Sequence, residues 1–124
     1  MRKLLVLLAI PLLFSCTGPQ PQKGVLKHVV MFKWKESATP EKITELSELF
    51  ASLPAKIDVI QGFEWGPDVS VEGLTKGYTH CYIVTFASEK ERDIYIPHPE
   101  HKAFGEALGP YLEDVLVVDF ISRQ

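Results

Sequence analysis

The chain of 124 residues has few cysteines, no apolar run long enough to cross a bilayer, and no excess of positive charge. Its two cysteines, Cys16 and Cys81, allow at most one disulfide within the chain. The 13 Lys and Arg side chains stand against 16 Asp and Glu, a formal net charge of -3 that argues against a nucleic-acid partner. The uncharged run from Leu4 to Phe14 is shorter than the roughly 20 residues that a spanning helix needs.

The beginning of the chain has the order of a secretory signal: Arg2 and Lys3, then the apolar run, then a small residue and a cysteine. Its end, Leu13-Phe14-Ser15-Cys16, resembles the lipobox of bacterial lipoproteins, in which the cysteine thiol is alkylated with diacylglycerol. Phe14 is bulkier than the usual residue there, and an ordinary secretory signal with a chance cysteine is the alternative. We expect residues 1–15 to be removed and Cys16 to anchor the chain to a bacterial membrane of the cell envelope, on its periplasmic or surface face.

Gly, Pro and Gln dominate the next stretch, which cannot bury enough apolar surface to fold. We therefore expect residues 16–24 to form a lipidated, flexible tether and residues 25–122 to form one domain. If a lipid occupies Cys16, no internal disulfide remains, and Cys81 is expected to be a buried free thiol in an apolar alternation.

Apolar periodicity predicts four strands with helices between them. Helix starts are predicted at Thr39-Pro40 and at Ser88, where Glu91 completes a capping box. The predicted strands are 25–34, 59–69, 78–86 and 115–121, and the predicted helices are 39–53, 88–95 and 99–108. The order β-α-β-β-α-β predicts an α+β, ferredoxin-like fold with a four-stranded antiparallel sheet and helices on one face.

The first and third strands are apolar on both faces. Period-two counting places Val30 and Phe32 on one side of the first strand and Val29 and Met31 on the other. A sheet with two apolar faces predicts a second sheet packed against it, so we expect a homodimer that forms a dimeric α/β barrel.

Four histidines could carry chemistry. His28 and His80 lie on the first and third strands, and would be close if those strands are neighbours. His98 and His101 are one helical turn apart around a proline-rich corner, just after Tyr95. The His98-x-x-His101 spacing suits zinc, but no cysteine pair or carboxylate motif accompanies it, so we expect no metal and no cofactor.

Several short segments, in this order and spacing, resemble the stress-responsive α/β barrel (Dabb) family over nearly all of residues 25–121. They are Lys27-His28-Val29-Val30, Trp65-Gly66-Pro67-Asp68-Val69, Gly77-Tyr78-Thr79-His80, Asp93-Ile94-Tyr95-Ile96-Pro97-His98-Pro99-Glu100-His101, Phe104-Gly105 and Asp119-Phe120. Members of that family are dimeric ferredoxin-like barrels, which agrees with the fold expected from the periodicity.

One member of the family is a plant cyclase that closes a linear polyketide thioester by an aldol condensation. The resemblance implies that Tyr95 and His101 are the reacting pair. A neutral imidazole can take an acidic proton near neutral pH, and a tyrosine hydroxyl can hold a carbonyl oxygen. We assign four neighbouring residues to ligand binding: His28, His80, Phe104 and Gly105.

Three functions are kept open. The first is binding of a small apolar ligand near the membrane, favoured because an exported protein would rarely meet a coenzyme A thioester. The second is a cyclase- or lyase-type enzyme with His101 as general base and Tyr95 positioning a carbonyl. The third is a structural dimeric module of the envelope. The site residues then have ordinary structural roles: Tyr95 packs with its hydroxyl satisfied, and His101 caps a helix or hydrogen bonds a strand end. His28 and His80 bond each other or backbone, and His98 is a turn or helix-cap residue.

Overall fold

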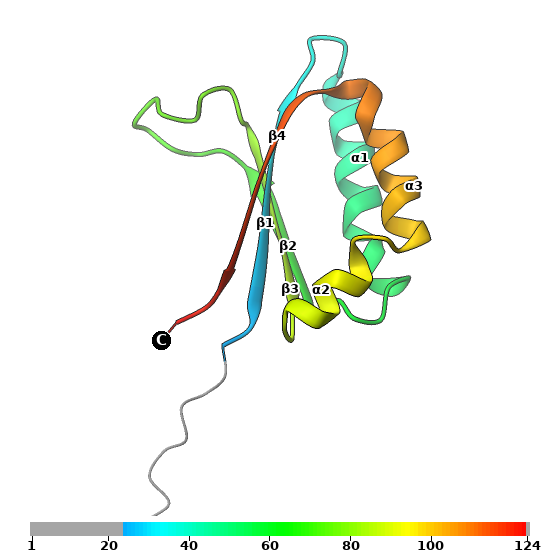
Figure 1. Ribbon diagram of the computed structural model, residues 1–124. Coiled ribbons are helices and arrows are strands. Elements are labelled where there is room, and N and C mark those ends of the chain that lie inside the picture. The colour runs from blue at the N-terminus through cyan, green and yellow to red at the C-terminus, as the bar shows by residue number, and fades with distance from the viewer. Residues whose placement is uncertain (1–23, 124) are drawn as a thin grey trace, which may run out of the picture.

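The computed structural model describes residues 24–123, which form one sheet covered on one face by helices (Figure 1). The expected signal peptide and all but Gly24 of the expected tether lie outside the described residues. The elements are β1 (Leu26–Trp34), α1 (Pro40–Ala51), η1 (Leu53–Ala55), β2 (Gly62–Pro67), β3 (His80–Phe86), α2 (Glu89–Tyr95), α3 (Pro99–Leu108), η2 (Gly109–Tyr111) and β4 (Leu112–Ile121).

The strand order in the sheet is β2-β3-β1-β4, and every neighbouring pair is antiparallel. Helix α1 connects β1 to β2, and β3 lies between these two strands in the sheet. Helices α2 and α3 together connect β3 to β4 across β1. This is the ferredoxin-like arrangement, so the predicted fold class is confirmed.

Polar side chains begin the three α-helices. The Thr39 hydroxyl accepts a hydrogen bond from the backbone N–H of Lys42 and thereby begins α1. Ser88 accepts from Lys90 N–H at the start of α2. His98 accepts a hydrogen bond from Glu100 N–H at the start of α3. It therefore caps this helix, which is one of the two structural roles predicted for it.

The strand bounds differ from the prediction at five ends. The first strand begins one residue later than predicted, at Leu26. The second strand is shorter than predicted, because Ile60 N–H bonds Ile57 O in a turn that precedes it. The third begins two residues later, because Tyr78 N–H bonds Thr75 O in another turn. The fourth begins earlier, at Leu112, across an irregularity in its register with β1.

The core lies between the sheet and the helices. Alternate β1 residues face the helices, as the periodicity predicted, and Val30 and Phe32 are buried there. Phe50 of α1 stacks on Phe104 of α3 with ring centroids 4.4 Å apart, and it also contacts Phe32. Apolar burial of this kind stabilises the two-layer structure by roughly 1.5–3 kcal/mol for each large side chain.

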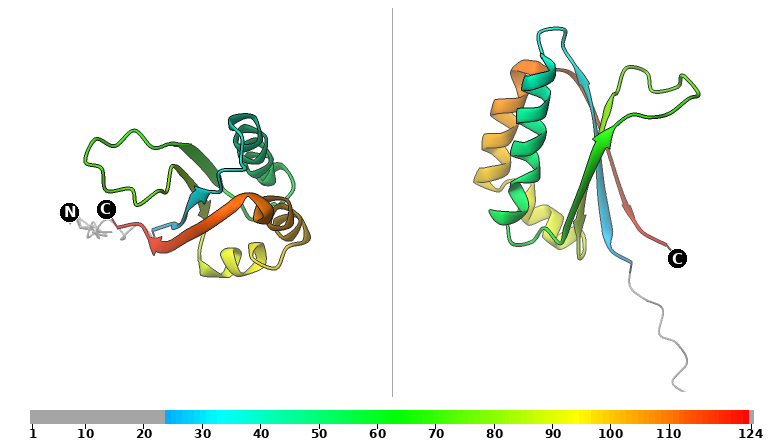
Figure 2. Two further views of the ribbon diagram at one scale, coloured as in Figure 1. Left: turned by 90° about the horizontal axis from the view of Figure 1, so that it is seen from above. Right: turned by 180° about the vertical axis from the view of Figure 1, so that it is seen from behind.

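The opposite face of the sheet is apolar and has no helix over it among the described residues (Figure 2). Residues 68–79 connect β2 to β3 and extend toward this side. On β4, Leu116, Val118 and Phe120 are between 39% and 50% exposed, which is high for large apolar side chains on a strand. Cys81 is a free thiol on this face, and is only partly buried rather than fully buried as expected. None of the helices described is long and apolar enough to cross a bilayer.

Candidate functional site

A small cavity of about 220 Å³ lies between the sheet and the helices α2 and α3. Three polar side chains line it: His28 from β1, Tyr95 from the end of α2, and His101 from α3. The remaining wall is apolar and is made by Val30, Phe32, Phe50, Ile96, Phe104, Gly105, Leu108 and Val117. Five of the six predicted catalytic or ligand-binding residues therefore lie around one cavity, and the exception is His80.

The local chain path explains why Tyr95 and His101 meet. Helix α2 ends at Tyr95, whose carbonyl accepts a hydrogen bond from His98 N–H at 3.0 Å. Pro99 occupies the first position of α3, where a missing N–H does no harm. The reversal between the two helices brings the Tyr95 and His101 rings to a centroid distance of 4.2 Å.

Tyr95 is fully buried, and its hydroxyl has no hydrogen-bond partner within residues 24–123. The ring contacts His28 at 5.7 Å between centroids and Phe86 at 5.0 Å. Burial raises the pKa of Tyr95 far above its usual range, so the hydroxyl stays protonated. It is therefore a hydrogen-bond donor without a partner among the described residues, and it belongs to a side chain in a largely apolar cavity wall.

His101 lines the same cavity, and one of its ring nitrogens can act as a hydrogen-bond acceptor. Its Nδ1 lies 2.9 Å from the carbonyl oxygen of Ile96, which can only accept, so Nδ1 carries the proton and Nε2 has the free lone pair. Burial lowers the pKa of His101. The bond to Ile96 raises it in part, and the charges of His28 and His98 lower it further. The imidazole is therefore neutral near pH 7 and able to accept a proton.

His28 has a carboxylate partner that the sequence analysis missed. Its Nδ1 lies 2.6 Å from Oδ1 of Asp119 on β4, which sits directly opposite in the strand ladder. The second oxygen of Asp119 accepts from Arg92 Nη1 at 3.0 Å. A signal was present in the sequence, because Asp119 is the one acid within the apolar run Val115–Ile121.

His80 does not join the cavity, and the expected closeness of His28 and His80 is wrong. Strands β1 and β3 are neighbours, but their register pairs His28 with Val84 and Phe32 with His80. The two histidines are thus four positions apart along the strands, about 13 Å at 3.3 Å per residue. His80 Nδ1 instead accepts from the indole N–H of Trp34 at 3.1 Å, and burial lowers the pKa of His80.

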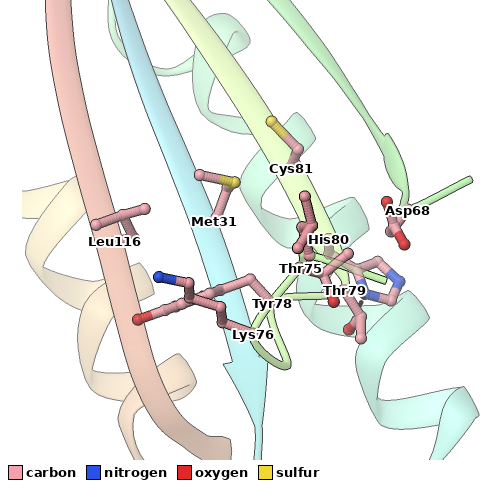
Figure 3. Close-up of a pocket in the computed structure, with 10 residues that line it drawn as sticks. Met31, Asp68, Thr75, Lys76, Tyr78, Thr79, His80, Cys81 and Leu116 are labelled. Carbon is pink, nitrogen blue, oxygen red and sulfur yellow. Dashed lines mark hydrogen bonds between the residues drawn. The ribbon is translucent and has the colours of Figure 1, made fainter. Parts of the chain in front are cut away.

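A larger hollow of about 360 Å³ lies on the opposite face, between the sheet and residues 68–79 (Figure 3). Met31 and Leu116 form part of its apolar floor, and Tyr78 extends from the loop toward β4. Two of its polar side chains are already paired: Tyr78 donates to Asp114 at 2.6 Å, and Asp68 accepts from Ser70 N–H. Within residues 24–123, no three His, Cys, Asp or Glu side chains are placed to hold a metal ion.

Known proteins resemble this chain in both sequence and fold. The sequence model of the stress responsive A/B barrel domain family matches residues 26–122. A stress-response A/B barrel domain-containing protein of Arabidopsis thaliana is 42% identical over 98 residues, covering 79% of this chain and 90% of the relative. Olivetolic acid cyclase of Cannabis sativa is 31% identical over 99 residues, covering 80% of this chain and 98% of the cyclase.

A solved structure agrees with these matches. The crystal structure of a dimeric ferredoxin-like protein of unknown function from Thermobifida fusca superposes with a TM-score of 0.68 at 25% identity. It covers 85% of this chain and 97% of that protein. The chain therefore belongs to the stress responsive A/B barrel domain family.

Proposed function

We propose that this protein binds a small, mainly apolar molecule carrying a carbonyl oxygen, in the cavity formed by His28, Tyr95 and His101. The observation that carries the proposal is the Tyr95 hydroxyl, buried in the cavity wall without a hydrogen-bond partner among the described residues. An unpaired buried hydroxyl costs about 1–3 kcal/mol, and a ligand oxygen that accepts its proton would recover that energy.

The cavity favours a ligand with one polar end. Tyr95 supplies a donor and His101 Nε2 supplies an acceptor, while the aromatic and aliphatic walls suit a phenyl ring or alkyl chain. A methyl ketone joined to a phenyl ring, such as 4-phenylbutan-2-one, has this distribution of polarity. It serves as a probe of the class rather than as the natural ligand.

Binding of the probe can be measured by calorimetry with the full-length chain in detergent micelles. We expect Tyr95→Phe to weaken binding about tenfold, the equivalent of one hydrogen bond of about 1.4 kcal/mol. His101→Asn should also weaken it. The matched control is His98→Asn, three residues away, because His98 lines no part of the cavity and asparagine also caps helices. Equal binding by all four proteins would contradict the proposal.

An enzymatic role is a second candidate, favoured by the neutral His101 beside Tyr95. His101 Nε2 would remove a proton from the carbon next to the carbonyl, and the electron pair would delocalise into the enolate. The enolate oxygen would accept a hydrogen bond from Tyr95. The similarity to olivetolic acid cyclase supports chemistry of this class, for which no metal is required.

Deuterium exchange separates binding from catalysis. If the protein only binds the probe, the protons next to the ketone carbonyl exchange with deuterium oxide at the rate seen without protein. If His101 acts as a base, the protein accelerates that exchange. His101→Asn should then abolish the acceleration, and His98→Asn should retain it. Proton NMR of the probe measures both rates, and an unaccelerated rate with bound probe would reject the enzymatic candidate.

We also propose that the protein which carries this cavity is a homodimer. The helix-free face of the sheet carries Val29, Met31 and Ile83 beside the exposed apolar residues of β4. Apolar patches of this kind mark protein interfaces, and similar ferredoxin-like structures are described as dimeric. We propose that two copies bury this face between their sheets.

The lipobox motif supports a membrane anchor on Cys16, which lies outside the described residues. A diacylglyceryl group and an amide-linked acyl chain would together hold the domain at the membrane surface. In a bacterial host, Cys16→Ser should prevent incorporation of radiolabelled palmitate and release the chain from the membrane fraction. Unchanged labelling and fractionation would reject the anchor without affecting the cavity.

A further inference from the structure

The cavity is open to solvent on one side, along strand β4. Val117 of β4 lines the cavity and is nevertheless 49% exposed. Its side chain lies on the helix-covered side of the sheet, because Val117 pairs with the buried Val30. Val115 lies on the same side and is also exposed. Nothing within residues 24–123 therefore fully covers this wall of the cavity.

Strand β4 is the longest strand of the sheet and lies at its edge. Large apolar side chains project from both of its faces and are exposed on both: Val115 and Val117 on one face, Leu116 and Val118 on the other. An exposed apolar edge strand readily joins other chains unless something covers it. A second sheet packed on the helix-free face would cover Leu116 and Val118. It would leave the face of Val115 and Val117 uncovered.

An arm of the chain, residues 68–79 between β2 and β3, has the most exposed large apolar side chains of the described structure. Three of them are 70–97% exposed: Val69, Val71 and Leu74. The arm stands out from the side of the sheet opposite the helices (Figure 2). Its base is held in place, since the Tyr78 hydroxyl donates to Asp114 of β4. Exposed apolar side chains gathered in this way mark a contact with another molecule.

A second copy of this chain fits as the molecule that the arm contacts. Similar ferredoxin-like structures are described as dimeric. The helix-free face of the four-stranded sheet spans roughly 500 Å², for strands of about eight residues. A stable interface buries about 800 Å² on each partner. Contact through the arm would supply part of the area that the sheet face lacks.

Two-fold symmetry can bring the arm of one copy to β4 of the other. Residues 32–34, at the end of β1, pair with the start of β3 on one side and with the start of β4 on the other. The arm and the start of β4 therefore lie at the same end of the sheet. A two-fold axis between the sheets and parallel to the strands keeps these ends together and reverses the strand order. The β2 edge of one copy then lies over β4 of the other.

The arm is long enough for this contact. Packed sheets lie about 10 Å apart. A chain segment that leaves β2 at Pro67 and returns at His80 can extend by roughly 20 Å from its base. It can therefore pass the edge of the partner's sheet and reach the uncovered face of the partner's β4.

We propose that the cavity is completed across the homodimer, with the arm of one copy covering β4 of the other and Val71 lying against Val117 of the partner subunit. This arrangement rests on the proposed binding cavity and homodimer, and it adds an apolar wall that a single chain lacks. Each site then combines His28, Tyr95 and His101 of one chain with an arm of the other. The dimer encloses a ligand that one chain leaves open to solvent.

Photo-cross-linking tests the contact without a ligand. The full-length chain in detergent micelles carries p-benzoylphenylalanine in place of Val71, whose exposed position accepts a larger side chain. Irradiation should give a covalent dimer on a denaturing gel, with the cross-link located in β4 of the other chain by mass spectrometry. The matched control has the same group in place of Glu48, an exposed residue of α1, and should give no covalent dimer. A cross-link within one chain, or outside β4, would overturn the proposal.

Mixed dimers test whether the arm acts on the cavity of the partner. Val71→Asp should weaken binding of 4-phenylbutan-2-one about tenfold, because a charge replaces an apolar contact at the cavity wall. Ser70→Asp, which adds the same charge one residue away, should weaken it less. An equal loss in both would overturn the proposal.

The decisive dimer combines one Val71→Asp chain with one chain that carries Tyr95→Phe and His101→Asn, isolated through two different tags. Its intact cavity meets the intact arm of the other chain, so it should bind one probe molecule with the affinity of the unmutated protein. If the arm acts on its own chain, the affinity stays about tenfold weaker and the proposal is overturned.

The cavity and the arm contact fail separately. If no form of the protein binds the probe, the proposed function fails, and the cross-link from Val71 alone decides the arm contact. If the cross-link lies outside β4, the arm contact fails while probe binding by the cavity stands. The cross-link also decides the proposal if Val71→Asp does not fold.

Discussion

Removal of the Tyr95 hydroxyl should make the unliganded protein more stable, which is the opposite of the usual effect of such a change. The hydroxyl is buried without a partner in the described structure, so the folded state carries its desolvation without compensation. That penalty is about 1–3 kcal/mol. The ring contacts of Tyr95 with His101 and His28 would remain in phenylalanine. We expect Tyr95→Phe to raise the free energy of unfolding by about 1–2 kcal/mol.

Tyr82 provides the matched control, because it is equally buried but its hydroxyl is paired. Tyr82 Oη lies 2.7 Å from Ser47 Oγ, and burial raises the pKa of Tyr82 to about 12. Tyr82→Phe loses this bond, while Ser47 keeps its bond to the carbonyl of Ile43. The expected effect is a loss of about 1 kcal/mol.

Urea unfolding of the full-length chain in detergent, followed by tryptophan fluorescence, measures both changes. Thermal unfolding should show the same signs, at about 4–8 °C for each kcal/mol in a domain of this size. If Tyr95→Phe destabilises the protein as much as Tyr82→Phe does, the Tyr95 hydroxyl has a partner in the unliganded state. The reasoning that reserves it for a ligand would then be refuted.

Three further predictions concern the histidine, the core and the open face of the sheet. Burial lowers the pKa of His101 in the folded state below its unfolded value near 6.5. The stability that neutral His101 contributes is therefore fully present above pH 6.5 and is lost as pH falls through the folded pKa. His101→Asn should flatten this pH dependence of the free energy of unfolding, measured by urea titrations between pH 7.5 and 5. Phe50→Ala should lower the free energy of unfolding by about 3–5 kcal/mol in the same assay, because it removes a ring packed on Phe104 and Phe32. Val118→Glu should convert the proposed homodimer to a monomer in sedimentation equilibrium with a density-matched detergent, and an unchanged mass would contradict the proposed interface.

Much of the fold could be predicted because its signals are local. Thr39 and Ser88 begin helices as their hydroxyls and the residues after them indicated. Alternation along β1 correctly separated the face of Val30 from the face of Val29. The strand ends were less predictable, because turns such as the one before Tyr78 depend on backbone hydrogen bonds rather than on hydrophobic pattern.

The site was only partly predictable, since it depends on register between strands far apart in the sequence. Alternation fixes the face on which a residue lies but not the residue opposite it, so His28 and His80 were placed too close together. The pairing of His28 with Asp119 was missed for the same reason, because it depends on the register between β1 and β4. Arg92 gave no signal of its own, because its bond to Asp119 follows from the position of α2 against β4.

The most direct test of the account is a crystal structure of the protein with 4-phenylbutan-2-one bound. We predict the ketone oxygen within hydrogen-bond distance of the Tyr95 hydroxyl, His101 beside the methyl ketone, and the phenyl ring among the aromatic side chains of the cavity. The probe in the hollow over Met31 and Leu116, with the Tyr95 cavity empty, would contradict the account.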